Sequence, residues 1–186
     1  APAAALAASR LDHRALAAVL QAGYTWTEST RQPRLAFLYS FGSGDKAATD
    51  TKSGTFQNLF PTNHLFYGYM DTTGWINMHN PQLNISFSPT PKLKVMLDYH
   101  LYWNATNADA WYRVNGATRV RPLNAAATGA GSTFRGQEID LTAIYKLNPH
   151  VGIMAGYSYF IAGDYLKATG AHGNAQFGYV QVQIDF

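Results

Sequence analysis

Seven stretches of the chain alternate between apolar and polar residues, and this pattern restricts the folds that the chain can adopt. The runs span residues 16–26, 34–41, 83–87, 93–103, 138–145, 151–160 and 179–186. Successive side chains of a β-strand point to opposite faces, so each run predicts a strand with one apolar and one polar face. In the run at 93–103, Leu97 and Tyr99 share one face and Asp98 and His100 share the other. The sequence therefore predicts an all-β, antiparallel protein.

The connections between these runs alternate between short and long. The short ones read TESTRQP, SPTPK and KLNPH, whereas the two longest cover residues 43–79 and 105–133. Short turns at one end and long loops at the other are typical of outer-membrane barrels, whose strands need ~9–11 residues to cross the lipid. Backbone polar groups must all be paired in lipid, which requires a closed barrel. We expect residues 1–186 to form a single unit, with 43–79 as a long extracellular or pore loop and 105–133 as a long extracellular loop.

The composition fits this interpretation and excludes several others. Charged residues make up 13% and aromatic residues 14% of the chain, and the mean hydropathy is −0.19. Low charge, many aromatic residues and a neutral mean are compatible when apolar and polar residues alternate. Cysteine is absent and the net charge is +3, so neither a disulfide framework nor nucleic-acid binding is indicated. The alternative is a soluble β-sandwich, but its wet faces would then carry unusually few Lys and Glu residues.

Three segments resemble a known family. GTFQNLFPTNHLFYGYMD (residues 54–71) resembles the hallmark loop of the alginate export family of bacterial outer-membrane barrels, and LKVMLDYHLYW and NADAWY follow in that family's order. The resemblance covers most of residues 15–186 and corresponds to the C-terminal part of the family. It implies a Gram-negative outer-membrane channel of about eighteen strands, of which about seven are present here. It also implies a polar solute, with an anionic oligosaccharide as the family's best-studied example.

Loop 54–71 contains the first group of candidate site residues. Its aromatic and amide side chains could stack on a sugar ring and bind its hydroxyls, or they could hold an inward-folded loop against the barrel wall. The apolar side chains of this loop would form a large patch if they were exposed to water. We therefore expect the loop to fold into or across the pore mouth. The candidates for the pore loop and substrate are Asn63, His64, Tyr67, Tyr69 and Asp71.

Charged residues give two further groups. The alternation places Lys94, Asp98, His100, Glu138 and Asp140 on the lumenal face. A strongly anion-selective pore would need a positive ring, which these residues do not supply. A basic cluster in the second long loop, Arg113, Arg119 and Arg121, could contact lipopolysaccharide phosphates, stay solvated, or clamp a carbohydrate carboxylate.

Catalysis, cofactors and metals find little support in the sequence. Asp98 and His100 lie two apart on one strand face, so a lumenal hydrolase is conceivable, but no nucleophile or phosphate-binding motif accompanies them. We expect no enzyme activity, no cofactor and no metal. The terminal Phe186 resembles the signal that the barrel insertion machinery recognises.

The strand count suggests that the barrel is incomplete. Seven is odd, whereas bacterial single-chain barrels have even numbers of strands, and an open wall would leave unpaired edges in lipid. We therefore expect further polypeptide to complete the barrel. The sequence favours an outer-membrane channel for a polar, or anionic, oligosaccharide or small solute. The alternative is a wall segment of a multi-chain outer-membrane assembly without its own transport activity.

Overall fold

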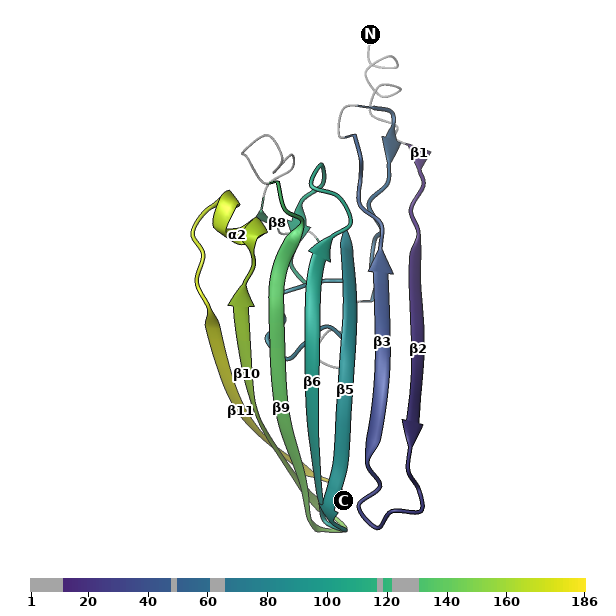
Figure 1. Ribbon diagram of the computed structural model, residues 1–186, viewed down its shortest axis with the longest axis vertical. Helices are drawn as coiled ribbons and strands as arrows, with labels where there is room; N and C mark the ends of the chain where they lie inside the picture. The colour runs from purple at the N-terminus through teal and green to yellow at the C-terminus, as the bar shows by residue number, and fades with distance from the viewer. Residues whose placement is uncertain (1–11, 48–49, 61–65, 117–118, 122–130) are drawn as a thin grey trace.

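A seven-stranded antiparallel sheet forms the body of the protein (Figure 1). The computed structural model describes residues 12–47, 50–60, 66–116, 119–121 and 131–186. The strands pair in the order β11-β10-β9-β6-β5-β3-β2. Their bounds are β2 Ala17–Thr25, β3 Arg34–Gly42, β5 Met78–Thr90, β6 Leu93–Asn104, β9 Phe134–Asn148, β10 Val151–Ala162 and β11 Ala175–Ile184. The prediction of an all-β, antiparallel fold with about seven strands is confirmed.

The connections are short at one end of the sheet and long at the other. The turns β2–β3, β5–β6 and β9–β10 lie at the end that also holds the C-terminus, and the long loops lie at the opposite end (Figure 1). Two small ladders involve segments of the long loops. β1 (Asp12–His13) pairs with β4 (Lys52–Ser53), and β7 (Trp111–Tyr112) pairs with β8 (Arg119–Arg121). A short helix, α2 (Asp164–Thr169), connects β10 to β11.

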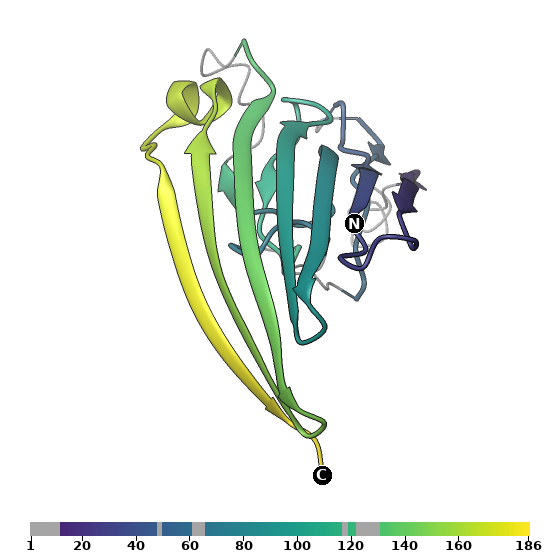
Figure 2. The ribbon, with the colours of Figure 1, turned by 60° about the horizontal axis from the view of Figure 1, so that its bottom comes forward.

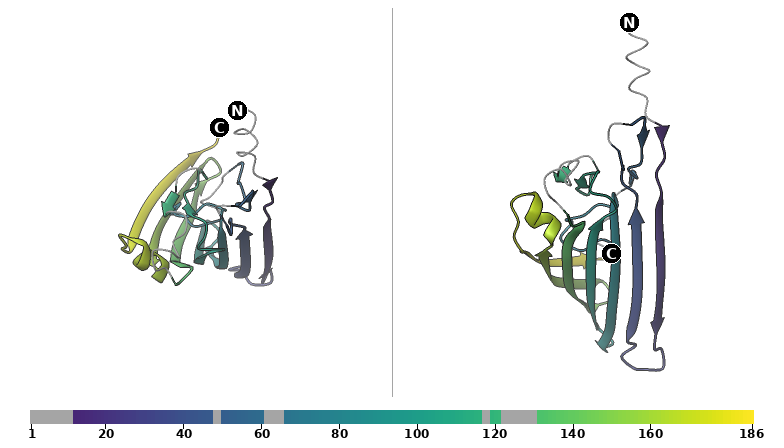
Figure 3. Two further views of the ribbon diagram at one scale, coloured as in Figure 1. Left: turned by 90° about the horizontal axis from the view of Figure 1, so that it is seen from above. Right: turned by 45° about the horizontal axis from the view of Figure 1, so that its top comes forward.

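The sheet is curved, and its two faces differ in chemistry. Seen from above, the strands form an arc around the loop segments (Figure 3), and the strands at the β11 side sweep furthest out of the plane (Figure 2). Leu97, Leu141 and Val182 are exposed on the convex face, whereas Asp98 and Asp140 are buried on the concave face. The alternation in the sequence thus becomes an apolar outer surface and a polar inner surface.

Three strands, β5, β9 and β11, begin four or five residues before the alternation predicts, and β11 starts at Ala175 rather than at residue 179. β5 begins at Met78 rather than near Leu83, so the first long loop ends at Asn77 rather than at residue 79. In this extension the inward side chains include the buried Asn80 and Gln82, and the outward positions hold His79 and Pro81. The outward residues are therefore no longer clearly more apolar than the inward ones, and the alternation is lost. β9 begins at Phe134, where a register irregularity opposite Tyr102 and Trp103 interrupts the alternation.

The sheet does not close on itself. β2 pairs only with β3, and β11 pairs only with β10, within the part of the chain that the structure describes. β1 pairs with β4 and adds no strand to this sheet. No helix among the described residues is long and apolar enough to cross a membrane.

Candidate functional site

Three carboxylates and a histidine form a buried polar cluster at the centre of the concave face. Asp98 and His100 on β6 lie directly opposite Asp140 and Glu138 on β9. Their exposed fractions range from 0% for Glu138 to 6% for Asp98. Like charges directly opposite each other on neighbouring strands are destabilising. The arrangement therefore calls for a compensating interaction on the open side of the sheet.

Amide side chains from β5 satisfy Asp98. Gln82 Nε2 and Asn84 Nδ2 donate to Asp98 Oδ1 over 2.9 and 2.7 Å. The register makes this possible, because Asn84 lies opposite Asp98 and Gln82 lies opposite His100. His100 is directed to the other side, where its Nε2 lies 3.5 Å from Asp140 Oδ2. The cluster thus continues across three strands.

The second half of the first long loop packs onto this cluster. The backbone N–H of Met70 donates to Glu138 Oε1 over 3.0 Å, and the Tyr102 hydroxyl donates to the carbonyl of Tyr67 over 3.0 Å. Between them, Gly68 has φ +87°, and a Cβ there would lie 2.5 Å from Glu138 Oε1. Only glycine permits this backbone approach without strain. Residues 66–70 are therefore attached to the sheet through its charged cluster.

The loop aromatics reinforce the attachment. Tyr69 stacks on Tyr179 of β11, with ring centroids 4.9 Å apart and an interplanar angle of 13°. Tyr67 is 4% exposed and packs near Trp75, and burial raises the pKa of its hydroxyl. The loop therefore bridges from the centre of the sheet to its β11 edge.

A pocket remains between this loop and the wall. It has a volume of about 270 Å³. Side chains from β2, β3, β5, β6, β9 and the loop line it, among them Arg34, Phe66, Tyr69, Gln82, Asp98 and Asp140. It is a concave space that carries both polar groups and aromatic rings, which is the usual composition of a small-molecule site.

The family model for alginate export matches residues 7–180, which is nearly the whole chain. The chain belongs to the alginate export family. A search of curated proteins found no match. The resemblance seen in the sequence is thereby confirmed, and membership of the alginate export family suggests an outer-membrane export channel.

Not all of the candidate loop residues can be placed in this alginate export family member. Asn63 and His64 lie outside the described residues. Tyr67 and Tyr69 contact the sheet as described above, and Asp71 is exposed with a positive φ of 52°. The structure thus brings Tyr67 and Tyr69 to the carboxylate cluster but leaves Asp71 at the surface.

The five charged residues assigned to the lumen share one face of the sheet but not one environment. Asp98, His100, Glu138 and Asp140 form the buried cluster, whereas Lys94 is exposed on the same face of β6. Arg34, on β3, lines the pocket and donates to Thr25 Oγ1 over 3.2 Å. The basic groups therefore lie at the margin of an acidic centre.

The basic residues of the second long loop also have different surroundings. Arg121 donates through Nε to Thr169 Oγ1 over 3.0 Å and through Nη2 to the carbonyl of Ala171, so it anchors the segment that contains α2. Arg113 and Arg119 are exposed. Arg121 therefore has a structural role, whereas Arg113 and Arg119 lie at the surface, with Arg119 close to the Tyr112 hydroxyl.

A second polar network, which the sequence did not single out, holds the two long loops together. Asp109 is fully buried and accepts hydrogen bonds from the Asp45 N–H, the Thr55 hydroxyl and the Tyr112 hydroxyl over 2.7–2.9 Å. Burial, and then the contact with Asp109, raises the pKa of Tyr112 to about 12. The signal for this network was the segment NADAWY, where an acid lies beside large aromatic residues.

Arg135 belongs to the same end of the sheet. Its guanidinium is fully buried and donates to Asn104 Oδ1 over 2.6 Å and to the carbonyl of Asn77, and it lies 5.3 Å from the centroid of the Trp111 ring. The structure buries Arg135 among loop carbonyls. It stabilises the loops rather than lining an open channel.

The arrangement offers little to hydrolysis or metal binding. A hydrolytic triad needs histidine between the nucleophile and the acid. Here Asp140 lies between His100 and Ser158 instead. Across the described ranges, no three His, Cys, Asp or Glu side chains are grouped so that they could hold a metal ion. What the described residues show of the polar cluster is attachment of the loop to the wall.

Proposed function

We propose that the protein forms part of an outer-membrane channel that passes a polar oligosaccharide or small solute. The observation that carries this proposal is the loop folded onto a polar concave face, while the opposite face of the same sheet is apolar and exposed. A soluble protein rarely exposes so large an apolar surface. Lipid on the convex side and water on the concave side would satisfy both faces.

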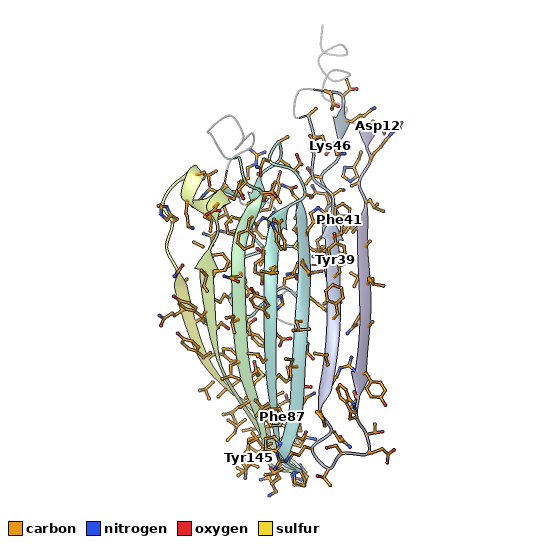
Figure 4. The ribbon with its side chains drawn as sticks, viewed as in Figure 1. Asp12, Tyr39, Phe41, Lys46, Phe87 and Tyr145 are labelled. Atoms are coloured by element: carbon orange, nitrogen blue, oxygen red, sulfur yellow. The ribbon has the colours of Figure 1, made fainter. Side chains whose placement is uncertain are left out.

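The outer surface supports a membrane position. The exposed apolar side chains on the convex face of the spanning strands include Leu20, Leu35, Phe37, Leu83, Ile85, Leu97, Ile139, Leu141, Tyr157, Val180 and Val182. Phe87 and Tyr145 lie at the short-turn end, and Tyr39 and Phe41 lie nearer the loop end (Figure 4). Aromatic residues at both ends of an apolar band are typical of outer-membrane barrels. Outer-membrane lipid is thus the proposed surrounding of the convex face.

The open edges require additional strands. β2 and β11 would leave unpaired N–H and C=O groups in lipid, which is energetically prohibitive. We propose that further polypeptide pairs with both edges and completes a larger barrel of about eighteen strands. The long loops would then be extracellular and the short turns periplasmic.

Two surface features fit the partners of such a barrel. The exposed Arg113 and Arg119 would contact the phosphates of lipopolysaccharide at the extracellular rim. Phe186, at the short-turn end, has a fully exposed side chain and would be read by the barrel insertion machinery. Both assignments follow from the proposed orientation of the barrel.

The proposal leaves two classes of solute, which differ in charge. The family description, alginate export, supports an anionic oligosaccharide. The acidic cluster at the centre of the concave face favours a polar solute without strong anion selectivity, because a positive ring is the usual means of selecting anions. Both solutes are compatible with a water-filled passage beside the loop.

Single-channel recording in planar bilayers tests the proposal. The protein should give reproducible unitary currents, and the reversal potential in a salt gradient should report its charge preference. Boiled protein from the same preparation is the control. A purified, inserted protein that gives no unitary current would refute the channel function.

The open sheet also favours a second candidate. A segment with two unpaired edges could contribute wall and loops to a multi-chain outer-membrane assembly without conducting by itself. Cross-linking through cysteines placed on β2 and β11 would then capture another polypeptide at both edges, and no current would accompany insertion of the purified chain.

A further inference from the structure

Phe177 is an accessible apolar side chain on the largely polar concave face of the sheet. It lies opposite the buried Ser158 in the β10–β11 register, and it is 40% exposed. The next inward residues along β11 are Tyr179, Gln181 and Gln183. An aromatic ring in a water-filled interior loses the burial that normally stabilises it. Something outside the described sheet is therefore expected to cover part of the Phe177 ring.

Phe177 belongs to a set of three stacked rings. It stacks on Tyr179, with ring centroids 5.6 Å apart and an interplanar angle of 25°, and Tyr179 also stacks on Tyr69 of the loop. The Tyr179 hydroxyl and Thr142 Oγ1 are hydrogen-bonded over 2.8 Å. The Tyr179 ring also lies so close to β10 that a Cβ added at Gly156 would overlap it. The rings are thus held by two neighbouring strands and by the loop.

A pocket on the β11 side of the loop, the β11 pocket, adjoins these rings. It has a volume of about 180 Å³, and Tyr69 is the one residue that it shares with the pocket described above. The residues that line it are uncharged: Tyr69, Met154, Phe177, Tyr179, Val180 and Gln181. The Gln181 side chain is exposed, and its amide offers two N–H donors and one acceptor oxygen.

Aromatic rings beside an amide match the two kinds of surface that a sugar presents. The face of an aromatic ring carries partial negative charge, which attracts the C–H hydrogens on the apolar face of a pyranose. An amide can donate to one hydroxyl and accept from another. A free ion would meet no opposite charge among the residues that line the β11 pocket. A purely apolar ligand would cover the amide of Gln181 without pairing it.

Additional strands would leave the β11 pocket open to the interior. A strand that pairs with the free edge of β11 lies beside it within the sheet, so it extends the wall without covering the concave face. The loop contributes Tyr69 to the pocket. A solute that passes the loop would therefore meet the rings of Tyr179 and Phe177.

We propose that the β11 pocket binds one pyranose unit of a saccharide. The rings of Phe177 and Tyr179 would stack on the sugar, and the amide of Gln181 would bind its hydroxyls. Its volume of about 180 Å³ is below the roughly 300–1,000 Å³ of drug-sized sites and suits a single sugar unit. The proposal deepens the channel function, on which it rests for the route by which the saccharide arrives.

Equilibrium dialysis with cellotriose, on the folded full chain in a detergent without a sugar head group, tests the pocket directly. We expect saturable binding that Phe177→Ala weakens by about fivefold or more, because a stacking contact is lost. Gln181→Met, which removes the hydrogen bonds but keeps a similar volume, should also weaken binding. Tyr157→Ala removes an aromatic ring that is 47% exposed on the convex face, and it should leave the affinity unchanged.

Two glycines on the same face of β10 give a matched pair of variants. Alanine at Gly156 would overlap the Tyr179 ring, whereas a Cβ at Gly152 meets nothing within 4 Å. Gly156→Ala should therefore displace the ring and weaken cellotriose binding, and Gly152→Ala should leave binding unchanged. Equal affinity in the two folded variants would mean that the Tyr179 ring takes no part in the site.

Hydroxyl-radical footprinting on the unaltered protein keeps the test decisive if a variant does not fold. Saturating cellotriose should protect Phe177 from oxidation, as measured by mass spectrometry. Sorbitol, which has hydroxyls but no pyranose ring, should neither protect Phe177 nor displace cellotriose. Absence of saturable binding, absence of protection, displacement by sorbitol, or equal affinity in the wild type and a folded Phe177→Ala variant would overturn the proposal.

Bilayer recordings separate this inference from the channel function. Cellotriose should lower the unitary current of the wild type, and Phe177→Ala should reduce this effect. Cellotriose binding without any unitary current would support the β11 pocket and refute the channel. Unitary current without cellotriose binding would support the channel and overturn the β11 pocket.

Discussion

Substitution of Gly68 by alanine should detach the loop from the wall. The positive φ of +87° costs a side-chain-bearing residue roughly 1–2 kcal/mol. The new Cβ would also lie 2.5 Å from Glu138 Oε1 and 2.6 Å from the Tyr102 hydroxyl oxygen. These are the two atoms that hold the loop, so relieving the overlap sacrifices both hydrogen bonds, roughly 1.5–3 kcal/mol for the charged one and 0.5–1.5 for the other. The attached state should therefore lose about 3–6 kcal/mol.

Hydrogen exchange at the backbone of residues 66–72, followed by mass spectrometry, measures this loss. The Met70 N–H, which donates to Glu138, should exchange at least about a hundredfold faster in Gly68→Ala, since each 1.4 kcal/mol is a factor of ten. Gly131→Ala is the matched control, because a Cβ there meets nothing within 4 Å. If Gly68→Ala exchanges as slowly as Gly131→Ala, the hydrogen bonds to Glu138 and Tyr102 do not hold the loop.

Three further predictions concern the pore, the lipid-facing surface and the second loop network. Deletion of residues 56–70 should increase unitary conductance; unchanged conductance would mean that the loop does not constrict the passage. Arginine at Leu97, on the convex face, should cost ~2–4 kcal/mol in unfolding from lipid, measured by urea titration, whereas arginine at Met96, which lines the pocket, should cost much less. Because the pKa of Tyr112 is raised to about 12, the folded state favours its proton, so its contribution to stability is complete below pH 10 and is lost as the pH rises towards 12. Absorbance at 295 nm and urea titrations should show this loss, and Tyr112→Phe should make it smaller.

The strands were predictable because their two faces meet different surroundings over most of their length. Leu97 and Leu141 are exposed on one face, and Asp98 and Asp140 are buried on the other, so the chemical contrast repeats every second residue. The start of β5 was missed because both of its faces lose that contrast. His79 faces outward, and its Nδ1 is hydrogen-bonded to the Tyr39 hydroxyl. Because histidine is polar, the pattern of apolar residues does not mark this position as outward-facing.

Side-chain partners in the loops were less accessible to sequence reasoning. The apolar content of residues 54–71 indicated that the loop would pack inward, but the anchoring atoms are a backbone N–H of Met70 and a backbone carbonyl of Tyr67. Backbone groups carry no residue-specific signal. Likewise, the Arg135 guanidinium donates to the backbone carbonyl of Asn77, 58 residues away in the chain, and only the fold brings them together.

The buried apolar side chains gather at the loop end of the sheet, and the rest of the concave face is polar. The larger apolar cluster combines Tyr102, Trp111, Phe160, Ala162, Tyr165 and Leu166, which come from the loop-side ends of β6 and β10, from β7 and from α2. Below it, the concave face carries Ser86, Asp98 and Thr142, which no apolar cluster covers. A water-soluble sheet would instead place its apolar core along the length of one face. The loop end is therefore stabilised as a small domain core would be, while the wall beneath it has an apolar convex face and a polar concave face, which is the division that the proposed channel requires.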